Sequence, residues 1–119
     1  MIKSQTTIAN AHDFTDTFTA EYDKNHDALT IITPTSGKKI KVTGVFVSTE
    51  GAAAAGQRVR FYFATSGDTI ATAVCTNAVT NVSIQPILIK GEVNESVSIT
   101  SNLGDDKNYF IAVNYREEG

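Results

Sequence analysis

Histidine, cysteine and paired carboxylates are the side chains most able to carry chemistry, and this sequence holds few of them. The two histidines, His12 and His26, lie in polar stretches, and Cys75 is the single cysteine. A metal site requires several such ligands at recognisable spacing, and a nucleophilic cysteine requires a base beside it. The sequence offers neither pattern, so we expect no metal, no cofactor and no enzymatic activity. Cys75 alternates with Ala71 and Ala73 and is therefore predicted to be a small buried core residue.

Carboxylates come in near pairs, which bind calcium or exchange protons where enough oxygens converge. The pairs are Asp105 with Asp106, Glu92 with Glu95, and Glu117 with Glu118. No EF-hand-like spread of ligands surrounds them, and adjacent acids in a loop more often solvate a turn. We interpret them as solvated and keep calcium as the minor alternative.

Four cations could gather on an otherwise acidic protein of net charge −3. Lys39 and Lys41 share one face of a predicted strand, and Arg58 and Arg60 share one face of the next. If these strands pair, the cations form a patch that could dock an acidic protein surface or an anionic glycan. The alternative, which we favour, is a solvated face whose charges prevent edge-to-edge aggregation.

The composition favours an all-β fold. Threonine, valine and isoleucine are abundant, and these β-branched residues suit a pleated surface better than a helix. The net charge argues against nucleic-acid binding, and no apolar run approaches the roughly 20 residues of a membrane helix. The N-terminus lacks the apolar core of a secretion signal, so we expect synthesis in a reducing cytoplasm, with later release by lysis still open.

Alternation of apolar and polar residues predicts about eight or nine short strands, spaced as in an antiparallel β-sandwich of jelly-roll type. The rest of the chain is arranged around one long strand near the middle. Ile40, Val42 and Phe46 share a parity there and are expected to face the core. Val45 and Val47, on the other parity, are also apolar, so we expect the second half of this strand to be covered on both sides.

Turn residues predict two hairpins. One joins residues 28–33 to the long strand through the Pro34–Gly37 turn, and the other joins residues 57–64 to residues 69–76.

The remaining segments are expected to be short strands and loops. Residues 50–56 and 77–81 are predicted loops, and Pro86 is expected to mark an edge or a bulge between two short strands. The closing strand, residues 108–116, is expected to turn alternate residues inward: Tyr109, Ile111, Val113 and Tyr115.

Residues 1–24 are predicted to form an N-terminal arm with the first strand, and residues 25–119 to form the sandwich domain. Phe14, Phe18 and Tyr22 share a parity and are expected to contact a partner or a neighbouring subunit. The polar segment before Phe14 is expected to be loosely attached until such a partner holds it.

Two stretches resemble segments of small tailed-bacteriophage virion proteins. One is Thr-Pro-Thr-Ser-Gly-Lys-Lys-Ile-Lys-Val-Thr-Gly-Val-Phe-Val-Ser-Thr at residues 33–49. The other runs from Gly-Glu-Val-Asn-Glu-Ser at residues 91–96 to Asn-Tyr-Phe-Ile-Ala-Val-Asn-Tyr at residues 108–115.

The resemblance implies a non-enzymatic virion structural protein that decorates and stabilises a capsid, or forms part of a fibre or tail. It implies other virion proteins as partners, a homo-oligomer with a trimer favoured, and location in the virion after synthesis in the host cytoplasm. No catalytic residue is carried over.

A carbohydrate- or receptor-binding module of a phage tail or fibre is the alternative function. Sugar sites use exposed aromatic platforms, and without tryptophan the candidates are Tyr62 and Tyr109. An enzyme ranks third, since no acid, base and nucleophile converge.

Overall fold

The computed structural model describes residues 16–75, 78–103 and 108–119. In these ranges the chain forms nine β-strands and no helix, which confirms the all-β prediction. Within the described part, no helix long and apolar enough to cross a membrane is found. The strands are β1 (Asp16–Tyr22), β2 (Leu29–Ile32), β3 (Lys39–Ala53), β4 (Arg58–Phe63), β5 (Thr69–Val74), β6 (Ala78–Ile84), β7 (Ile89–Lys90), β8 (Val97–Ser101) and β9 (Tyr109–Glu118).

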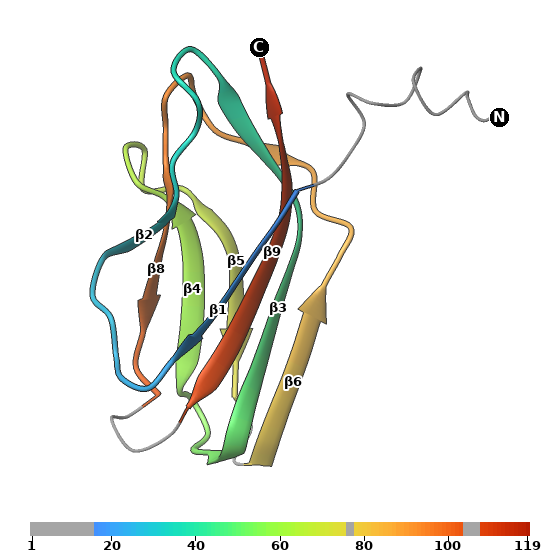
Figure 1. Ribbon diagram of the computed structural model, residues 1–119. Helices are drawn as coiled ribbons and strands as arrows, with labels where there is room; N and C mark the ends of the chain where they lie inside the picture. The colour runs from blue at the N-terminus through green and yellow to red at the C-terminus, as the bar shows by residue number, and fades with distance from the viewer. Residues whose placement is uncertain (1–15, 76–77, 104–107) are drawn as a thin grey trace, which may run out of the picture.

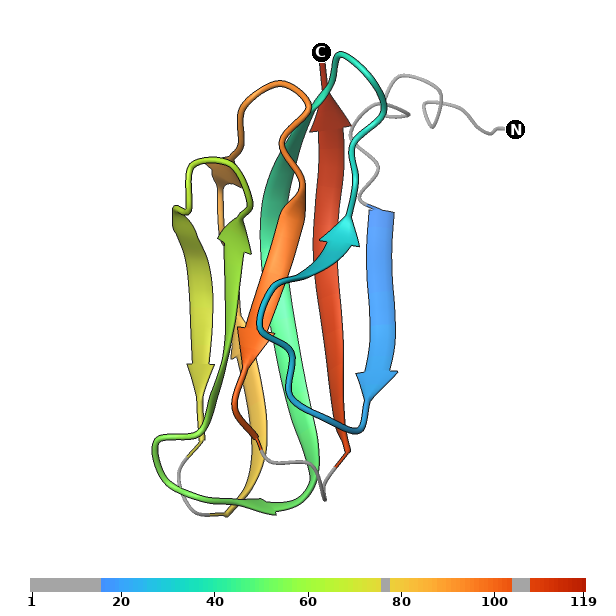
Figure 2. The same cartoon turned by 90° about the vertical axis from the view of Figure 1, so that its left-hand side faces the viewer.

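Two antiparallel sheets pack face to face, as Figures 1 and 2 show. Sheet A has the order β1-β9-β3-β6, with β7 also paired to β3, and sheet B has the order β2-β8-β4-β5. The pairs β1 with β9, β2 with β8, β3 with β6 and β7, and β4 with β5 are nested in the sequence. A nested antiparallel ladder rolled into two layers is the jelly-roll arrangement, and the predicted antiparallel sandwich is confirmed.

The core lies between the sheets and is built from alternate residues of the strands, as predicted for β9. Cys75, 3% exposed, belongs to this core as expected. The most deeply buried apolar side chains include Val59, Phe61, Phe63, Val97, Ile99, Tyr109, Ile111 and Val113.

The hairpin of β4 and β5 and the interruption at Pro86 are both confirmed. Gly67 takes a φ of +79° in the hairpin turn, where the Asp68 carbonyl accepts a hydrogen bond from the Phe63 backbone N–H at 2.9 Å. β6 ends at Ile84 and β7 begins at Ile89, and both pair with β3.

The other predicted hairpin is wrong, because β2 lies in sheet B and β3 in sheet A. The turn itself forms as expected: the Lys38 backbone N–H donates to the Thr35 carbonyl at 2.9 Å, and Gly37 has a φ of +85°. Turn chemistry is local, whereas the sheet that a strand joins depends on partners elsewhere in the chain.

A one-residue bulge interrupts β3. Val42 lies opposite Tyr115 of β9, but the next pair joins Gly44 to Asn114, so Thr43 is the additional residue. The Thr43 hydroxyl donates to the Asn114 carbonyl at 3.1 Å, which fixes the bulge to β9.

The bulge reverses the parity that faces the core. Val42 is buried before it, and Val45 and Val47 are buried after it, while Phe46 is half-buried on the outer side. The predictions that Phe46 faces the core and that this half is covered on both sides are therefore wrong. The available sign was Gly44, since glycine inside a strand often marks a bulge.

Both predicted loops are partly strand. β3 continues to Ala53, which is 1% exposed, so only the end of the 50–56 segment is a turn. β6 begins at Ala78, inside the predicted 77–81 loop, and pairs with the end of β3. Pairing between these distant segments overrides their weak local preference.

β1 pairs with β9 along its whole length, from Asp16 opposite Tyr115 to Tyr22 opposite Tyr109. Phe18 and Tyr22 pack against the core. The strand expected within residues 1–24 is thus an edge strand of sheet A.

The bulge predicts unequal effects of two adjacent substitutions. Val45→Ser is expected to lower the free energy of unfolding by about 2 kcal/mol or more, because it places a hydroxyl in the core. Phe46→Ser is expected to cost less than half as much, although it removes the larger side chain. Urea denaturation measures both, and a larger loss for Phe46→Ser would contradict the reversed parity.

Candidate functional site

The four predicted cations do not form one patch, because their strands belong to different sheets. Lys39 and Lys41 lie on β3 in sheet A, and Arg58 and Arg60 lie on β4 in sheet B. Each pair alternates with buried residues, so the two pairs lie on opposite outer faces of the sandwich.

Arg60 is held by its own sheet. Its Nε donates to Thr69 Oγ1 at 2.8 Å, and a terminal nitrogen donates to the Gly67 carbonyl at 2.6 Å. Its guanidinium carbon lies 4.6 Å from the centre of the Tyr62 ring, a cation–π distance. These contacts fasten the β4–β5 hairpin.

Lys41 has different neighbours from those predicted. Lys90 of β7 and Arg116 of β9 lie directly opposite it in the sheet, and Lys39 lies opposite Glu118. We call Lys39, Lys41, Lys90, Arg116 and Glu118 the basic patch.

Glu118 is the carboxylate of the basic patch. One oxygen lies 2.6 Å from Lys90 Nζ, and the other accepts from Arg116 Nε at 3.0 Å and lies 3.9 Å from Lys41 Nζ. The hydrogen bond from Lys90, together with the one from Arg116, lowers the pKa of Glu118. One carboxylate thus bridges cations from three strands.

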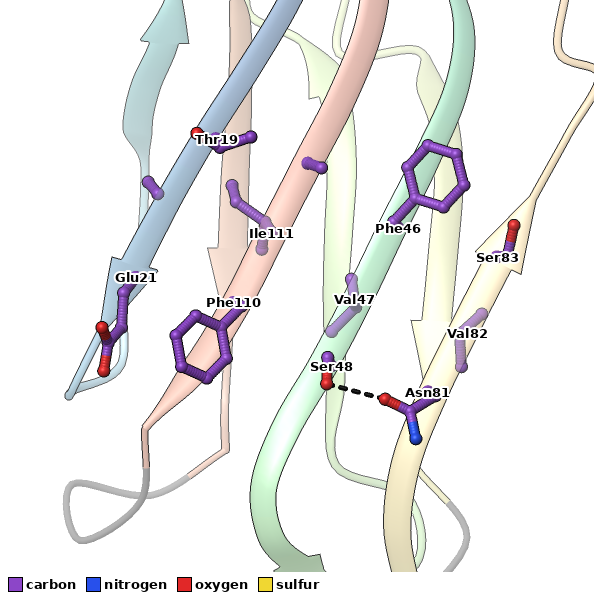
Figure 3. Close-up of a pocket in the computed structure, with 12 residues that line it drawn as sticks. Thr19, Glu21, Phe46, Val47, Ser48, Asn81, Val82, Ser83, Phe110 and Ile111 are labelled. Atoms are coloured by element: carbon purple, nitrogen blue, oxygen red, sulfur yellow. Dashed lines mark hydrogen bonds between the residues drawn. The ribbon is translucent and has the colours of Figure 1, made fainter.

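The same outer face of sheet A holds a shallow depression of about 620 Å³. Figure 3 shows the Phe46 ring on β3 and the Phe110 ring on β9, at positions that lie diagonally to each other across the two strands. Ala112 lies opposite Phe46, and its small side chain leaves space beside both rings. The outward side chains form two cross-strand rows: Glu21, Phe110, Ser48 and Asn81, and Thr19, Ala112, Phe46 and Ser83.

The depression is mainly apolar, with polar side chains toward its edges. Phe110 is 40% exposed, which is high for a large apolar residue in a central strand. Ser48 and Asn81 are joined by a 2.7 Å hydrogen bond, and the Glu21 carboxylate accepts from Asn108 Nδ2 at 2.8 Å. Glu21 is the carboxylate in the lining, so no acid–base pair meets there. The depression thus presents apolar surface beside a few polar side chains.

Metal binding finds no support in residues 16–75, 78–103 and 108–119. No group of three or more His, Cys, Asp or Glu side chains there could hold a metal ion. Asp105, Asp106 and His12 lie outside the described residues.

The predicted contact residues of the N-terminal segment face inward where they are described. The Phe18 and Tyr22 side chains are half-buried against the core. The Tyr22 ring meets the His26 ring edge-on at 4.8 Å between centroids. Phe14 lies outside the described residues, so its predicted contact stays a prediction.

Both predicted aromatic platforms are engaged within the fold. Tyr109 is fully buried; its hydroxyl donates to the Lys24 carbonyl at 3.0 Å and shares a 2.7 Å hydrogen bond with Ser101 Oγ. Burial raises the pKa of Tyr109. Tyr62 is half-buried beside Arg60.

Two of the acids interpreted as solvated have structural roles. Glu117 accepts hydrogen bonds from the Thr35 backbone N–H and hydroxyl at 2.6 and 2.8 Å, which lower its pKa. Glu95 is 2% exposed, so for this residue the interpretation is wrong.

Glu95 joins two loops. Its carboxylate accepts from the backbone N–H groups of Thr65 and Glu92, both at 2.9 Å, and from that of Ser66. Burial by itself raises the pKa of Glu95, but the hydrogen bonds outweigh burial and the pKa lies below its ordinary value. Alternation along the chain gave no sign of this role, because two of its three donors, Thr65 and Ser66, lie about 30 residues away in sequence.

Neither a protein family nor a curated protein sequence matches this chain. Its fold is similar to that of a chain in the solved structure titled "Acidic stable capsid structure of Helicobacter pylori bacteriophage KHP30". The TM-score is 0.54 at 15% identity, over 92% of this chain and 96% of that one. The likeness concerns the fold, and it agrees with the resemblance to phage virion proteins seen in the sequence.

Glu95→Gln is expected to lower the free energy of unfolding at pH 7 by about 2 kcal/mol, since charge-assisted hydrogen bonds are lost. A carboxylate with a lowered pKa contributes stability above its unfolded pKa of about 4.3, and loses that contribution as the pH falls through the folded value. The difference from the wild-type protein should therefore shrink below about pH 4. Urea denaturation across pH tests this.

Glu92→Gln is the matched control, because Glu92 is exposed and close in sequence. It should leave stability within about 0.5 kcal/mol at either pH. An equal loss for both variants would contradict the structural role of Glu95.

Proposed function

We propose that this chain is a non-enzymatic structural protein of a bacteriophage virion, which binds the capsid surface as a decoration or stabilising protein. The observation that carries the proposal is the fold likeness to a chain of a phage capsid structure, over nearly the full length of both chains. A jelly roll hosts many functions, so the site must support the proposal as well.

The outer face of sheet A supports a binding role. It combines an apolar depression with a basic patch, and both are open to solvent. Among the described residues, no acid, base and nucleophile converge as an active site would need.

The carbohydrate-binding alternative has less support. Of its two expected platforms, Tyr109 is fully buried and Tyr62 is covered on one side by Arg60. The depression offers phenylalanine rings but few polar groups to fix sugar hydroxyls.

The proposal includes assembly into a homo-oligomer, with a trimer favoured and residues 1–13 reaching to a neighbouring subunit. Native mass spectrometry of the purified protein should give a trimer. Removing residues 1–13 should shift the mass distribution toward monomer, or weaken binding to capsids. A monomeric full-length chain, or unchanged assembly and binding after truncation, would count against this part.

The virion role is tested on particles purified from cells that carry the gene. Quantitative mass spectrometry should find the chain in the particles at a simple integer ratio to the major shell protein, as expected for a surface lattice. A few copies per particle would indicate a tail or fibre component instead, and absence from the particles would refute the proposal.

A further inference from the structure

We propose that the outer face of sheet A is the docking face, and that its occupant is an acidic, partly apolar segment on the surface of the virion shell protein. This inference rests on the proposed function and goes further, because it assigns the face and the chemistry of the partner. The carboxylates of the segment pair with the basic patch, and an apolar side chain enters the depression between Phe46 and Phe110.

Charge is the first argument. Arg116, Lys41 and Lys90 lie directly opposite one another on three adjacent strands. Like charges opposite each other destabilise a sheet, and here one carboxylate, Glu118, bridges them. An anionic partner relieves this repulsion.

The charge distribution over the chain points the same way. The basic patch holds four of the 10 Lys and Arg residues and one of the 13 Asp and Glu residues. The rest of the chain therefore has six cations and twelve acids. The patch is therefore a local reversal of sign on an acidic protein. It is complementary to an acidic surface and repels a basic one.

The apolar depression is the second argument. The solvated face of an antiparallel sheet is ordinarily polar, yet Phe110 and Phe46 occupy the middle of this one. Aromatic residues beside a hollow are the usual anchors of protein interfaces. About 620 Å³ is ample room for the apolar side chain of a partner.

The two features share one face at a fixed separation. From Ala112, in the depression, to Arg116, in the basic patch, is four residues along β9, or roughly 13 Å at strand rise. Between them lie Asn114 and Thr17, joined by a 2.9 Å hydrogen bond. An extended segment with an apolar residue four positions from its acids matches this spacing.

The outer face of sheet B serves as the comparison. The depression there, lined by Arg58, Thr100, Ser101 and Asn102, measures only about 60 Å³. Of the two cations of this face, Arg58 is exposed, and Arg60 is held by Thr69, Gly67 and Tyr62. The two outer faces thus provide a test face and a control face on one molecule.

The experiment measures binding of the full-length protein to shells purified from a phage in which its gene is deleted. Ala112→Arg fills the depression, and Thr19→Arg fills it independently from β1. Lys41→Glu and Lys90→Glu each reverse one charge of the basic patch and lower its net charge from +3 to +1. Val74→Arg and Arg58→Glu make comparable changes at exposed positions of sheet B.

The depression variants are expected to weaken shell binding by about tenfold or more. The two lysine variants should weaken shell binding at low salt. Their binding should also depend less on salt, because salt screens the attraction between these lysines and the shell, and the variants lack that attraction. The sheet B variants should bind like the wild type. Urea denaturation of each variant checks folding, and two independent substitutions per feature keep the test valid if one fails to fold.

The outcomes separate the two levels of the proposal. No binding of the wild type to deleted shells would overturn the proposed function, and the inference with it. If the wild type binds the shells and the folded sheet A variants bind them equally well, the inference is overturned but the proposed function stands. Native mass spectrometry measures self-association of the same variants. If they lose self-association but still bind shells, the face binds a second copy of this chain, and the inference is overturned as well.

Discussion

One extra residue in β3 is the constraint on which the rest of the structure depends. β3 is the longest strand, and it pairs with β9 on one side and with both β6 and β7 on the other. A strand of strict alternation would keep one parity inside from end to end. The bulge at Thr43 lets Val42 and Val45 both enter the core, and so turns Phe46 outward. The burial of Val45 and the outward position of Phe46 beside the depression therefore arise from the same irregularity.

Buried polar groups hold the two ends of the sandwich. At one end, the Tyr109 hydroxyl donates to the Lys24 carbonyl, and Ser101 Oγ accepts from the His26 backbone N–H, so both residues bind the segment between β1 and β2. At the other end, Glu95 connects its own loop to the β4–β5 turn through backbone N–H groups. A buried carboxylate is stable only when such donors satisfy it. These anchors keep the strands in register and leave the outer faces to other roles.

The outer face of sheet A brings together aromatic and cationic side chains from three strands. Phe46 and Lys41 come from β3, Phe110 and Arg116 from β9, and Lys90 from β7. A rigid sheet holds such groups at fixed spacing without an ordering cost on binding, which favours recognition of a surface.

The sequence by itself determined the strand content, the inward face of β9, the β4–β5 hairpin and the burial of Cys75. These follow from alternation and turn residues, which act within a few positions of the chain. Only the tertiary structure decided that β2 and β3 separate into two sheets, that Lys41 meets Lys90 and Arg116, and that Glu95 is buried. Those outcomes depend on pairing between residues far apart in sequence. Within a strand, a single extra residue such as Thr43 also changes which face the side chains after it point to.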